Sequence, residues 1–348
     1  NTIIDAVKDF LLLLKPVLYI VLGFYFTSKI KEKAFIFDLL IYIAAFFAII
    51  HIVKVTFYLV DHPFAVNRVR DIGGKDNVIE LFALIVLFSG IRQKVFYKKT
   101  KYYKFFKTII IISFFLYFSR TMLVTGLIFL LAIKGYTKLT RKGIMYISFF
   151  IISALAFYSY LNSIEIERGS SGIEGLMYKI KLAPAEIFLT QIDIKDHAKL
   201  WDHWRGYEAL KAYEQLTDTP FGMGLLFGKG TGSLVDLEFV APLNEEGMQY
   251  ISTLHNGYAF ILFKSGIVGL VCYLVFLFNI YIQAYKKDKN KILINNFISG
   301  IAIYYAFSTL VITGIYNKVE VLAIVLGSFL YLSSNKYKTI NENRNFRN

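Results

Sequence analysis

The stretch TIIIISFFLYFSRTMLVTGLIFLLAI, residues 108–133, decides the fold of this chain. It holds two apolar runs, residues 108–119 and 121–133, which meet at Arg120. Neither run has the roughly 20 residues that a comfortable crossing of a bilayer needs. The stretch is therefore either one long buried span with an arginine at its middle, or two short, tilted helices that turn at Arg120.

The composition is that of an integral membrane protein. Of the 348 residues, 56% are hydrophobic and 18% are charged, and the mean hydropathy is +0.52, whereas a soluble domain has roughly 25% charged residues. The single cysteine, Cys272, excludes an intrachain disulfide and any multi-cysteine metal site. The net charge of +14 falls mostly in short loops beside apolar runs, so we expect membrane lipids, and not nucleic acid, as the partner.

Seven further apolar runs are candidate membrane spans, which gives nine spans with the two short helices. The seven runs are residues 10–28, 35–60, 77–92, 143–162, 257–283, 293–313 and 319–333.

The charge of the loops decides how the chain passes Arg120. Five loops, residues 29–33, 92–107, 134–142, 286–291 and 334–348, carry 3, 7, 4, 4 and 4 Lys or Arg. The positive-inside rule places these loops in the cytoplasm. An even number of crossings must then separate the second loop from the third, so the chain turns back near Arg120, which faces outward.

The same rule places four segments outside, namely residues 1–9, 61–76, 163–254 and 314–318. Because the chain starts outside and opens with Asn, we expect further spans upstream. The sequence thus predicts an all-α, polytopic transmembrane helical bundle with a large helical extracytoplasmic loop. Its domains are N-terminal transmembrane helices (1–162), a cap loop (163–254), and C-terminal transmembrane helices with a cytoplasmic tail (255–348).

The cap loop has its own organisation. Aromatic and apolar residues recur every three or so positions over residues 201–217, which predicts an amphipathic helix. Pro220 ends this helix, and a series of glycines between residues 222 and 232 predicts a flexible loop.

The cap loop contains two patterns that suggest a ligand site, a P-loop and an acidic metal-binding pair, and neither is convincing. A phosphate-binding P-loop needs Gly at position 223 and Ser or Thr after the lysine, but the chain has Met223 and places Gly230 after Lys229. Asp236 and Glu238 resemble an acidic metal-binding pair, but such a pair in an acidic loop is common by chance. We therefore predict no metal and no cofactor.

Arg120 is the first candidate for chemistry. An arginine at the end of a span can simply extend its charge to the membrane surface. Apolar runs flank Arg120 closely on both sides, however, and no acidic side chain lies within a turn of it in sequence. A phosphate group on a ligand could be the anionic partner of Arg120, because a guanidinium binds phosphate with two charge-assisted hydrogen bonds.

Arg205 and His255 are the second and third candidates. Arg205 lies three residues before Glu208 in the predicted cap helix, so a surface ion pair between these two is an equal alternative. His255 precedes the span that starts near residue 257. A helix N-terminus favours neutral imidazole, which can accept a proton, although a hydrogen-bonded interfacial histidine would look the same.

Together these segments resemble the O-antigen polymerase and O-antigen ligase superfamily. Four motifs in order carry the resemblance, which runs from about residue 60 to 283: Arg70, Gly73 and Asn77; Ser119-Arg120-Thr121 between two short apolar helices; Arg205 followed by Pro220-Phe221-Gly222-Met223-Gly224; and His255-Asn256-Gly257-Tyr258 followed by Gly266 and Gly269. The chain departs from the family at Ala209, where Trp is usual.

The resemblance implies a GT-C-like, metal-independent inverting glycosyltransferase in the bacterial inner membrane, with its site facing the periplasm. Its donor would be a polyprenyl-diphosphate-linked glycan and its acceptor another glycan, with a chain-length regulator as a further candidate partner. Arg120 and Arg205 would stabilise the departing diphosphate, and His255 would deprotonate or orient the acceptor hydroxyl. Arg70, Asn256 and Tyr258 are the expected substrate-binding residues.

Three functions remain open at this point. We favour a polymerase of lipid-linked repeat units of O-antigen or another surface polysaccharide. A ligase that transfers the lipid-linked glycan to lipid A core shares the same motifs. A flippase for lipid-linked oligosaccharides would also have many spans, but it predicts internal repeats that the sequence lacks.

Overall fold

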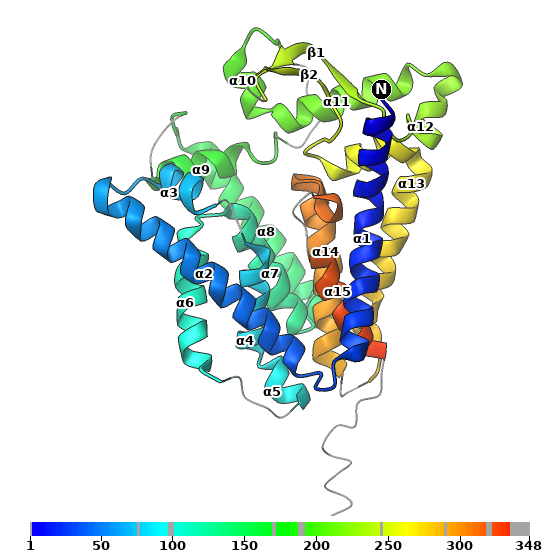
Figure 1. The fold of residues 1–348 in the computed structure, drawn as a ribbon. Helices are drawn as coiled ribbons and strands as arrows, with labels where there is room; N and C mark the ends of the chain where they lie inside the picture. Colours follow the sequence, from blue (N-terminus) through cyan, green and yellow to red (C-terminus); the bar gives the residue numbers. More distant parts are fainter. Residues whose placement is uncertain are drawn as a thin grey trace, which may run out of the picture. The chain divides into compact units, whose positions relative to one another are not determined.

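A computed structural model of the chain is almost entirely helical (Figure 1). It describes residues 2–74, 77–96, 101–168, 172–186, 192–243, 246–288, 291–317 and 322–334. Five helices of this described part are long and apolar enough to cross a membrane: α1 (Ile3–Lys29), α2 (Phe35–Asp61), α8 (Arg141–Ser163), α13 (Gly257–Tyr281) and α14 (Ile292–Val311). The chain is thus a multi-pass membrane protein built mainly from α-helices.

The other four predicted spans are also helices, but short ones. They are α4 (Val78–Ser89), α6 (Tyr103–Leu116), α7 (Arg120–Ile133) and α15 (Leu322–Ser334), and each has 12 to 14 residues. At about 1.5 Å per residue, such a helix covers only two thirds or so of the hydrocarbon core. Nine membrane crossings therefore stay a prediction.

The chain packs as two compact units. Unit 1 comprises Asn1–Tyr19, Lys179–Ile280 and Ala302–Ala323, and unit 2 comprises Ile20–Tyr178, Tyr281–Ile301 and Ile324–Asn348. This division follows packing, whereas the predicted domains 1–162, 163–254 and 255–348 follow membrane topology and stay a prediction.

Helix α4 is the centre of unit 2. Every residue from Glu80 to Leu87 is buried, and α4 packs against α2, α6 and α7. Phe82 contacts the rings of Phe129 and Phe297, and Phe297 stacks on Phe329 with 4.4 Å between ring centroids. Burial on all sides explains why the sequence of α4 is a continuous apolar run and not an amphipathic one.

The break between α6 and α7 lies where two short helices were predicted to meet. Helix α6 ends at Leu116, and Phe118 takes a left-handed conformation (φ 46°) that no helix can continue through. Ser119 then caps α7, because its hydroxyl accepts a hydrogen bond from the Met122 amide. Arg120 is thus the first residue of α7, in a turn whose geometry Ser119 fixes.

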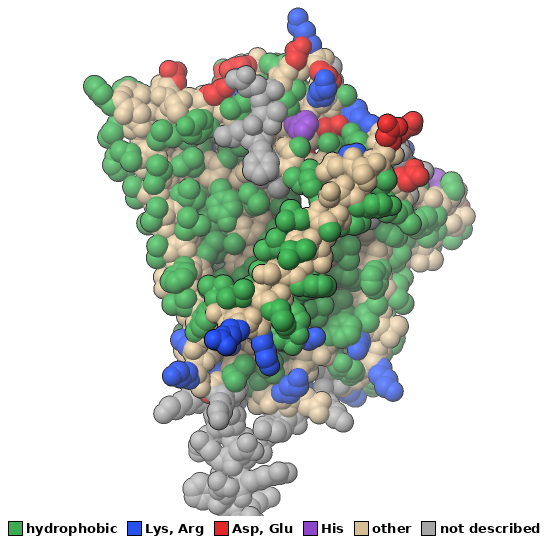
Figure 2. All heavy atoms as spheres, turned by 180° about the vertical axis from the view of Figure 1, so that it is seen from behind, with side chains coloured by type: hydrophobic (Ala, Val, Ile, Leu, Met, Phe, Trp, Pro, Cys, Tyr) green, Lys and Arg blue, Asp and Glu red, His purple; other side chains and the backbone are tan. Residues whose placement is uncertain are grey.

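One end of unit 2 is basic. Figure 2 shows Lys and Arg side chains gathered along the lower edge of the molecule, below a broad band of hydrophobic side chains. Many apolar side chains of unit 2 are exposed, among them Phe46, Phe57, Ile152 and Leu155. Exposed apolar faces of this extent fit lipid contact.

The cap region of unit 1 is not purely helical, which corrects the predicted helical loop. Helices α10 (His197–Asp202), α11 (Trp204–Thr217) and α12 (Met223–Phe227), with a short 3-10 turn at Pro220–Gly222, are joined by an antiparallel hairpin of β1 (Val235–Ala241) and β2 (Met248–Ile251). A further helix, α9 (Gly172–Leu182), precedes them. The predicted amphipathic helix is present as α11, which packs on β1.

The glycine loop after α12 is docked, although the sequence predicted a flexible loop. The amides of Lys229 and Gly230 donate to the carbonyls of Phe263 and Lys264 on α13. Helix α13 is kinked there at Gly266 (φ 64°). A Cβ on Gly266 would lie 2.2 Å from the Leu226 carbonyl oxygen, so only glycine allows the two backbones to meet.

A buried ion pair fastens this junction to α1. The Lys264 ammonium lies 2.5 Å from the Asp9 carboxylate, and both side chains are almost completely buried. The ammonium also donates to the Ser233 carbonyl, and the same carboxylate accepts from the Gly232 amide. Each buried charge is therefore compensated within unit 1.

Candidate active site

The candidate site in unit 1 is built around a carboxylate–imidazole pair. Both carboxylate oxygens of Glu208, on α11, lie 3.0–3.1 Å from Nδ1 of His255, and one of them accepts from the His255 amide at 2.9 Å. The Glu208 side chain is 2% exposed, whereas that of His255 is 52% exposed. The acid is thus buried behind a histidine that presents its other face to the outside.

This geometry fixes the chemistry of the imidazole. An ionised carboxylate can only accept, so Nδ1 carries the proton that it shares with Glu208. Nε2 is then the basic nitrogen, and the carboxylate stabilises the imidazolium that forms when Nε2 takes a proton. A group that touches His255 at Nε2 meets an oriented proton acceptor.

Arg205 lies on the same helix, one turn before Glu208. Its guanidinium donates to Glu186 at 2.7 Å, and the Arg205 side chain is 27% exposed. The predicted alternative, an ion pair between Arg205 and Glu208, is wrong because Glu208 holds His255 instead. Residues three apart on a helix have Cβ atoms about 5–6 Å apart, so the backbone positions of Arg205 and of Glu208, which holds His255, are neighbours on α11.

Helix α11 is held rigidly against the hairpin. The Tyr207 hydroxyl donates to the Leu237 carbonyl at 2.6 Å, and Gln215 bonds to both backbone groups of Asp236. Lys211 pairs with Glu214 and Glu238. Burial acts to lower the pKa of the Lys211 ammonium, but these two hydrogen bonds outweigh it and raise that pKa. Glu208 therefore stands on a braced scaffold.

The side chains of Asn256 and Tyr258 both form hydrogen bonds with the backbone. The Asn256 side-chain oxygen accepts from the amides of Tyr258 and Ala259, so it caps α13. The Tyr258 hydroxyl donates to the Ala306 carbonyl at 2.8 Å. Their substrate-binding role stays a prediction, and these bonds give both residues a second reason to be present.

Arg120 and Arg70 belong to unit 2. Arg120 begins α7, and Arg70 lies on α3 (Val66–Gly73), which packs on α2 and α6. The Arg70 Nε atom is buried and has no hydrogen-bond partner within the described residues. An arginine nitrogen in that state is free to donate to a ligand oxygen.

A buried polar network lies behind the turn that carries Arg120. The Tyr117 hydroxyl donates to Glu80 at 2.9 Å, and Asn77 donates to the same carboxyl oxygen. The His51 ring stacks on Tyr117 at 3.9 Å and bonds to Ser113 at 2.8 Å. This network fixes residue 117 and so the direction in which the chain enters α7.

The structure therefore places Arg205, His255 and Asn256 in unit 1, and it places Arg120 and Arg70 in unit 2. The sequence interpretation missed Glu208 as the partner of His255. The two residues are 47 positions apart, and the only local signal was an acid on the buried face of a cap helix beside Trp204 and Tyr207.

Within the described residues, no group of three or more His, Cys, Asp or Glu side chains could hold a metal ion. Asp236 and Glu238, which resemble an acidic metal-binding pair in the sequence, have partners within the protein. Asp236 accepts from Gln249 and from the Glu238 amide, and Glu238 pairs with Lys211.

One comparison with known proteins found a match. Residues 105–274 match the family model described as O-antigen ligase. The match confirms the predicted resemblance to the O-antigen polymerase and ligase superfamily and supports a glycosyltransferase-like enzyme that uses a lipid-linked glycan in a membrane. The match includes Arg120, Arg205, Glu208 and His255 and leaves Arg70 outside. A search of curated proteins and a search of solved structures gave no match.

Proposed function

We propose that this member of the O-antigen polymerase and ligase superfamily is an inverting glycosyltransferase that polymerises polyprenyl-diphosphate-linked repeat units. It would act at the outer face of the bacterial cytoplasmic membrane. The observation that carries the proposal is the Glu208–His255 pair, because it supplies an oriented general base.

The acceptor hydroxyl attacks the anomeric carbon of the donor, and its proton passes to Nε2 of His255. The bond from the anomeric carbon to the phosphate oxygen breaks on the opposite face, so the configuration inverts. The electron pair stays on the departing polyprenyl diphosphate, and His255 later releases its proton to water.

Arg205 and Arg120 would stabilise the charge on the departing diphosphate. Fixed cations at a leaving group contribute several kcal/mol in a water-poor site, so no metal ion is needed for this role. Arg205 is one helical turn from the acid that holds His255. Arg120 would have the same role, and Arg70 is a secondary candidate for binding the diphosphate.

Arg120→Ala, Arg205→Ala and His255→Ala should each abolish surface glycan polymer in a deletion strain, with protein levels unchanged. The expected reason is loss of leaving-group stabilisation or of the general base, each worth about 10²- to 10⁴-fold in rate. Gel profiles of the glycan measure the outcome. Near-normal polymer with His255→Ala would overturn the proposal.

The ion pair between Arg205 and Glu186 allows a matched control. If Arg205 serves only this pair, Glu186→Gln should be as damaging as Arg205→Ala. If Arg205 serves the diphosphate, Glu186→Gln should keep most polymer and Arg205→Ala none. Equal loss in both variants would return Arg205 to a purely structural role.

Ligation is the second candidate function, because the matching family model is described as an O-antigen ligase. The site chemistry is common to both reactions, since only the acceptor differs. Loss of a polymerase leaves single repeat units, whereas loss of a ligase leaves long chains still attached to the carrier lipid. The same gels, with the lipid-linked fraction run separately, distinguish the two.

A further inference from the structure

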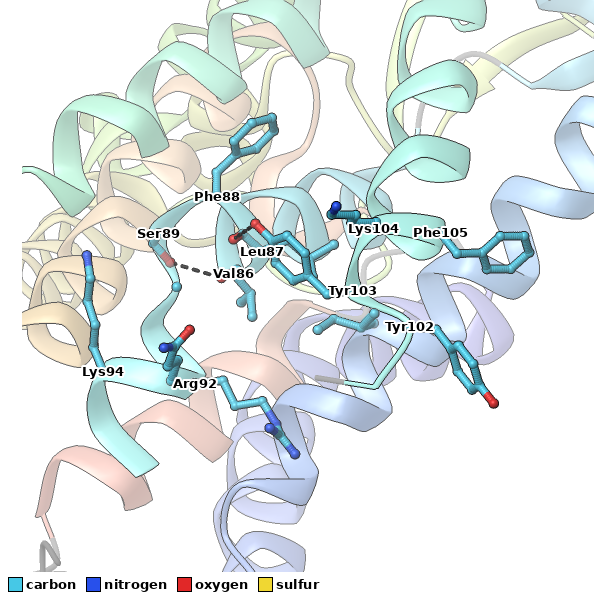
Figure 3. Close-up of a pocket in the computed structure, with 13 residues that line it drawn as sticks. Val86, Leu87, Phe88, Ser89, Arg92, Lys94, Tyr102, Tyr103, Lys104 and Phe105 are labelled. Carbon is cyan, nitrogen blue, oxygen red and sulfur yellow. Dashed lines mark hydrogen bonds between the residues drawn. The ribbon is translucent and has the colours of Figure 1, made fainter. Parts of the chain in front are cut away.

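A cavity of about 810 Å³ lies at the basic end of unit 2. It is formed by the end of α4, by α5 (Ile91–Phe96) and by the start of α6, with Ile41 of α2 as a further wall. Figure 3 shows α5, with Arg92 and Lys94, on one side and Tyr102 to Phe105 on the other. None of the lining residues is acidic.

Arg92 gives this cavity a buried cation. Its guanidinium pairs with Asp38 at 2.5 Å, and the two side chains are only 10% and 13% exposed. The Nε and Nη1 atoms of Arg92 are buried and have no hydrogen-bond partner within the described residues. Buried donors of this kind are normally satisfied, so they point to an acceptor that occupies the cavity.

Lysines add positive charge around this arginine. Lys94 and Lys104 line the cavity, and the Lys107 ammonium lies 4.1 Å from the centre of the Phe88 ring. Asp38 balances Arg92, so the lysines set the net sign of the site. The Tyr103 hydroxyl donates to the Leu87 carbonyl and is thus occupied.

The apolar part of the lining indicates what carries the anion. Ile41, Val86 and Leu87 form an apolar wall, while Phe88 and Phe105 are more than half exposed at its edge. Residues 92–107 contain seven Lys or Arg and no acid, which places this end of unit 2 at the cytoplasmic leaflet. A ligand that is anionic at one end and apolar at the other fits both parts.

We propose that this cavity binds the phosphodiester headgroup of an acidic phospholipid of the cytoplasmic leaflet. The phosphate would lie between Lys94 and Lys104 and accept from Arg92, while the acyl chains leave past Phe88 and Phe105. Basic pockets between helices on the cytoplasmic side have this property, and each basic residue contributes about 1 kcal/mol.

Native mass spectrometry of the purified, delipidated protein tests the proposal. Phosphatidylglycerol and phosphatidylcholine with identical acyl chains are titrated separately, with inorganic phosphate as competitor. Lys94→Gln/Lys104→Gln should weaken phosphatidylglycerol binding about 30-fold, the equivalent of two basic contacts. Lys94→Arg/Lys104→Arg should retain it. Phosphatidylcholine should bind equally weakly to all variants.

Arg141→Gln/Lys142→Gln is the matched control, because these exposed residues at the start of α8 are not part of the cavity lining. It should leave phosphatidylglycerol binding unchanged. Equal weakening in the control, or no preference for phosphatidylglycerol over phosphatidylcholine, would overturn the proposal. Displacement of the lipid by equimolar inorganic phosphate would also overturn it, because the site would then be one for a free anion.

Discussion

The neighbourhoods of Arg205 and Arg120 are held in place by different forces. In unit 1, charged groups are matched with opposite charges, as in Arg205 with Glu186 and Lys264 with Asp9. In unit 2, the turn before Arg120 is fixed by a serine cap, a stacked histidine and the hydrogen bond from Tyr117 to Glu80.

This difference predicts which polar positions tolerate substitution with little loss of stability. Removing one member of a buried ion pair leaves a charge that nothing else can compensate, whereas removing one neutral hydrogen bond leaves a smaller deficit. The buried ion pairs of unit 1 should therefore be more sensitive to single substitutions than the turn before Arg120. Removing the partner as well should restore much of the stability lost at such a pair.

The largest effect is expected at the buried pair on α1 and α13. Asp9→Ala should lower the free energy of unfolding by about 3–5 kcal/mol, because the Lys264 ammonium stays buried without its carboxylate. Thermal unfolding of the purified protein in detergent measures this. Asp9→Leu/Lys264→Met should recover much of the loss, and a double variant no more stable than the single one would contradict the ion-pair explanation.

Glu208→Gln should lower the rate of polymer formation by about 10- to 100-fold, because an amide orients the His255 ring but stabilises its imidazolium poorly. Protein level and thermal midpoint should hardly change. Glu214→Gln is the control, since Glu214 lies on the same helix and pairs with Lys211 only. If the two variants have equal rates, Glu208 does not act through His255.

In unit 2, Tyr117→Phe should cost about 1–2 kcal/mol of stability, because it removes one hydrogen bond to the buried Glu80 carboxyl and preserves the ring that stacks on His51. The same unfolding experiment applies. Tyr117→Leu, which also removes the stacking, should cost more. A loss with Tyr117→Phe as large as that of Asp9→Ala would remove the distinction between the buried ion pair and the turn before Arg120.

The smallest effect is expected for Ser119→Ala. Loss of the cap on α7 should cost about 1 kcal/mol, with Ser119→Thr close to the wild type. Because the cap also sets the direction of Arg120, polymer formation should fall with Ser119→Ala more than this small loss of stability explains. Unchanged polymer length and amount would show that the cap serves the fold alone.

The helices could be predicted from the sequence because apolar runs in a bilayer must satisfy their own backbone hydrogen bonds. The turn at Arg120 followed from loop charge. The hairpin could have been found, since Val235, Leu237, Phe239 and Ala241 alternate with other residues as a half-buried strand requires.

Other features had no local signal. The docking of the glycine loop depends on a kink at Gly266, and the pairing of Glu208 with His255 joins segments 47 residues apart. Both the docked loop and the Glu208–His255 pair depend on two segments that become neighbours only when the chain folds. Residue types therefore indicated Arg205 and His255 as candidates, and only packing showed the acid that holds His255.

The most direct test asks whether Glu208 acts through His255 as the proposed general base. The rate of polymer formation is measured for Glu208→Gln, for His255→Ala and for the double variant, at matched protein levels. We predict that the double variant is no slower than His255→Ala, because Glu208 has nothing to orient once the imidazole is gone. A double variant that is slower than His255→Ala by the full factor lost in Glu208→Gln would contradict this role of the pair.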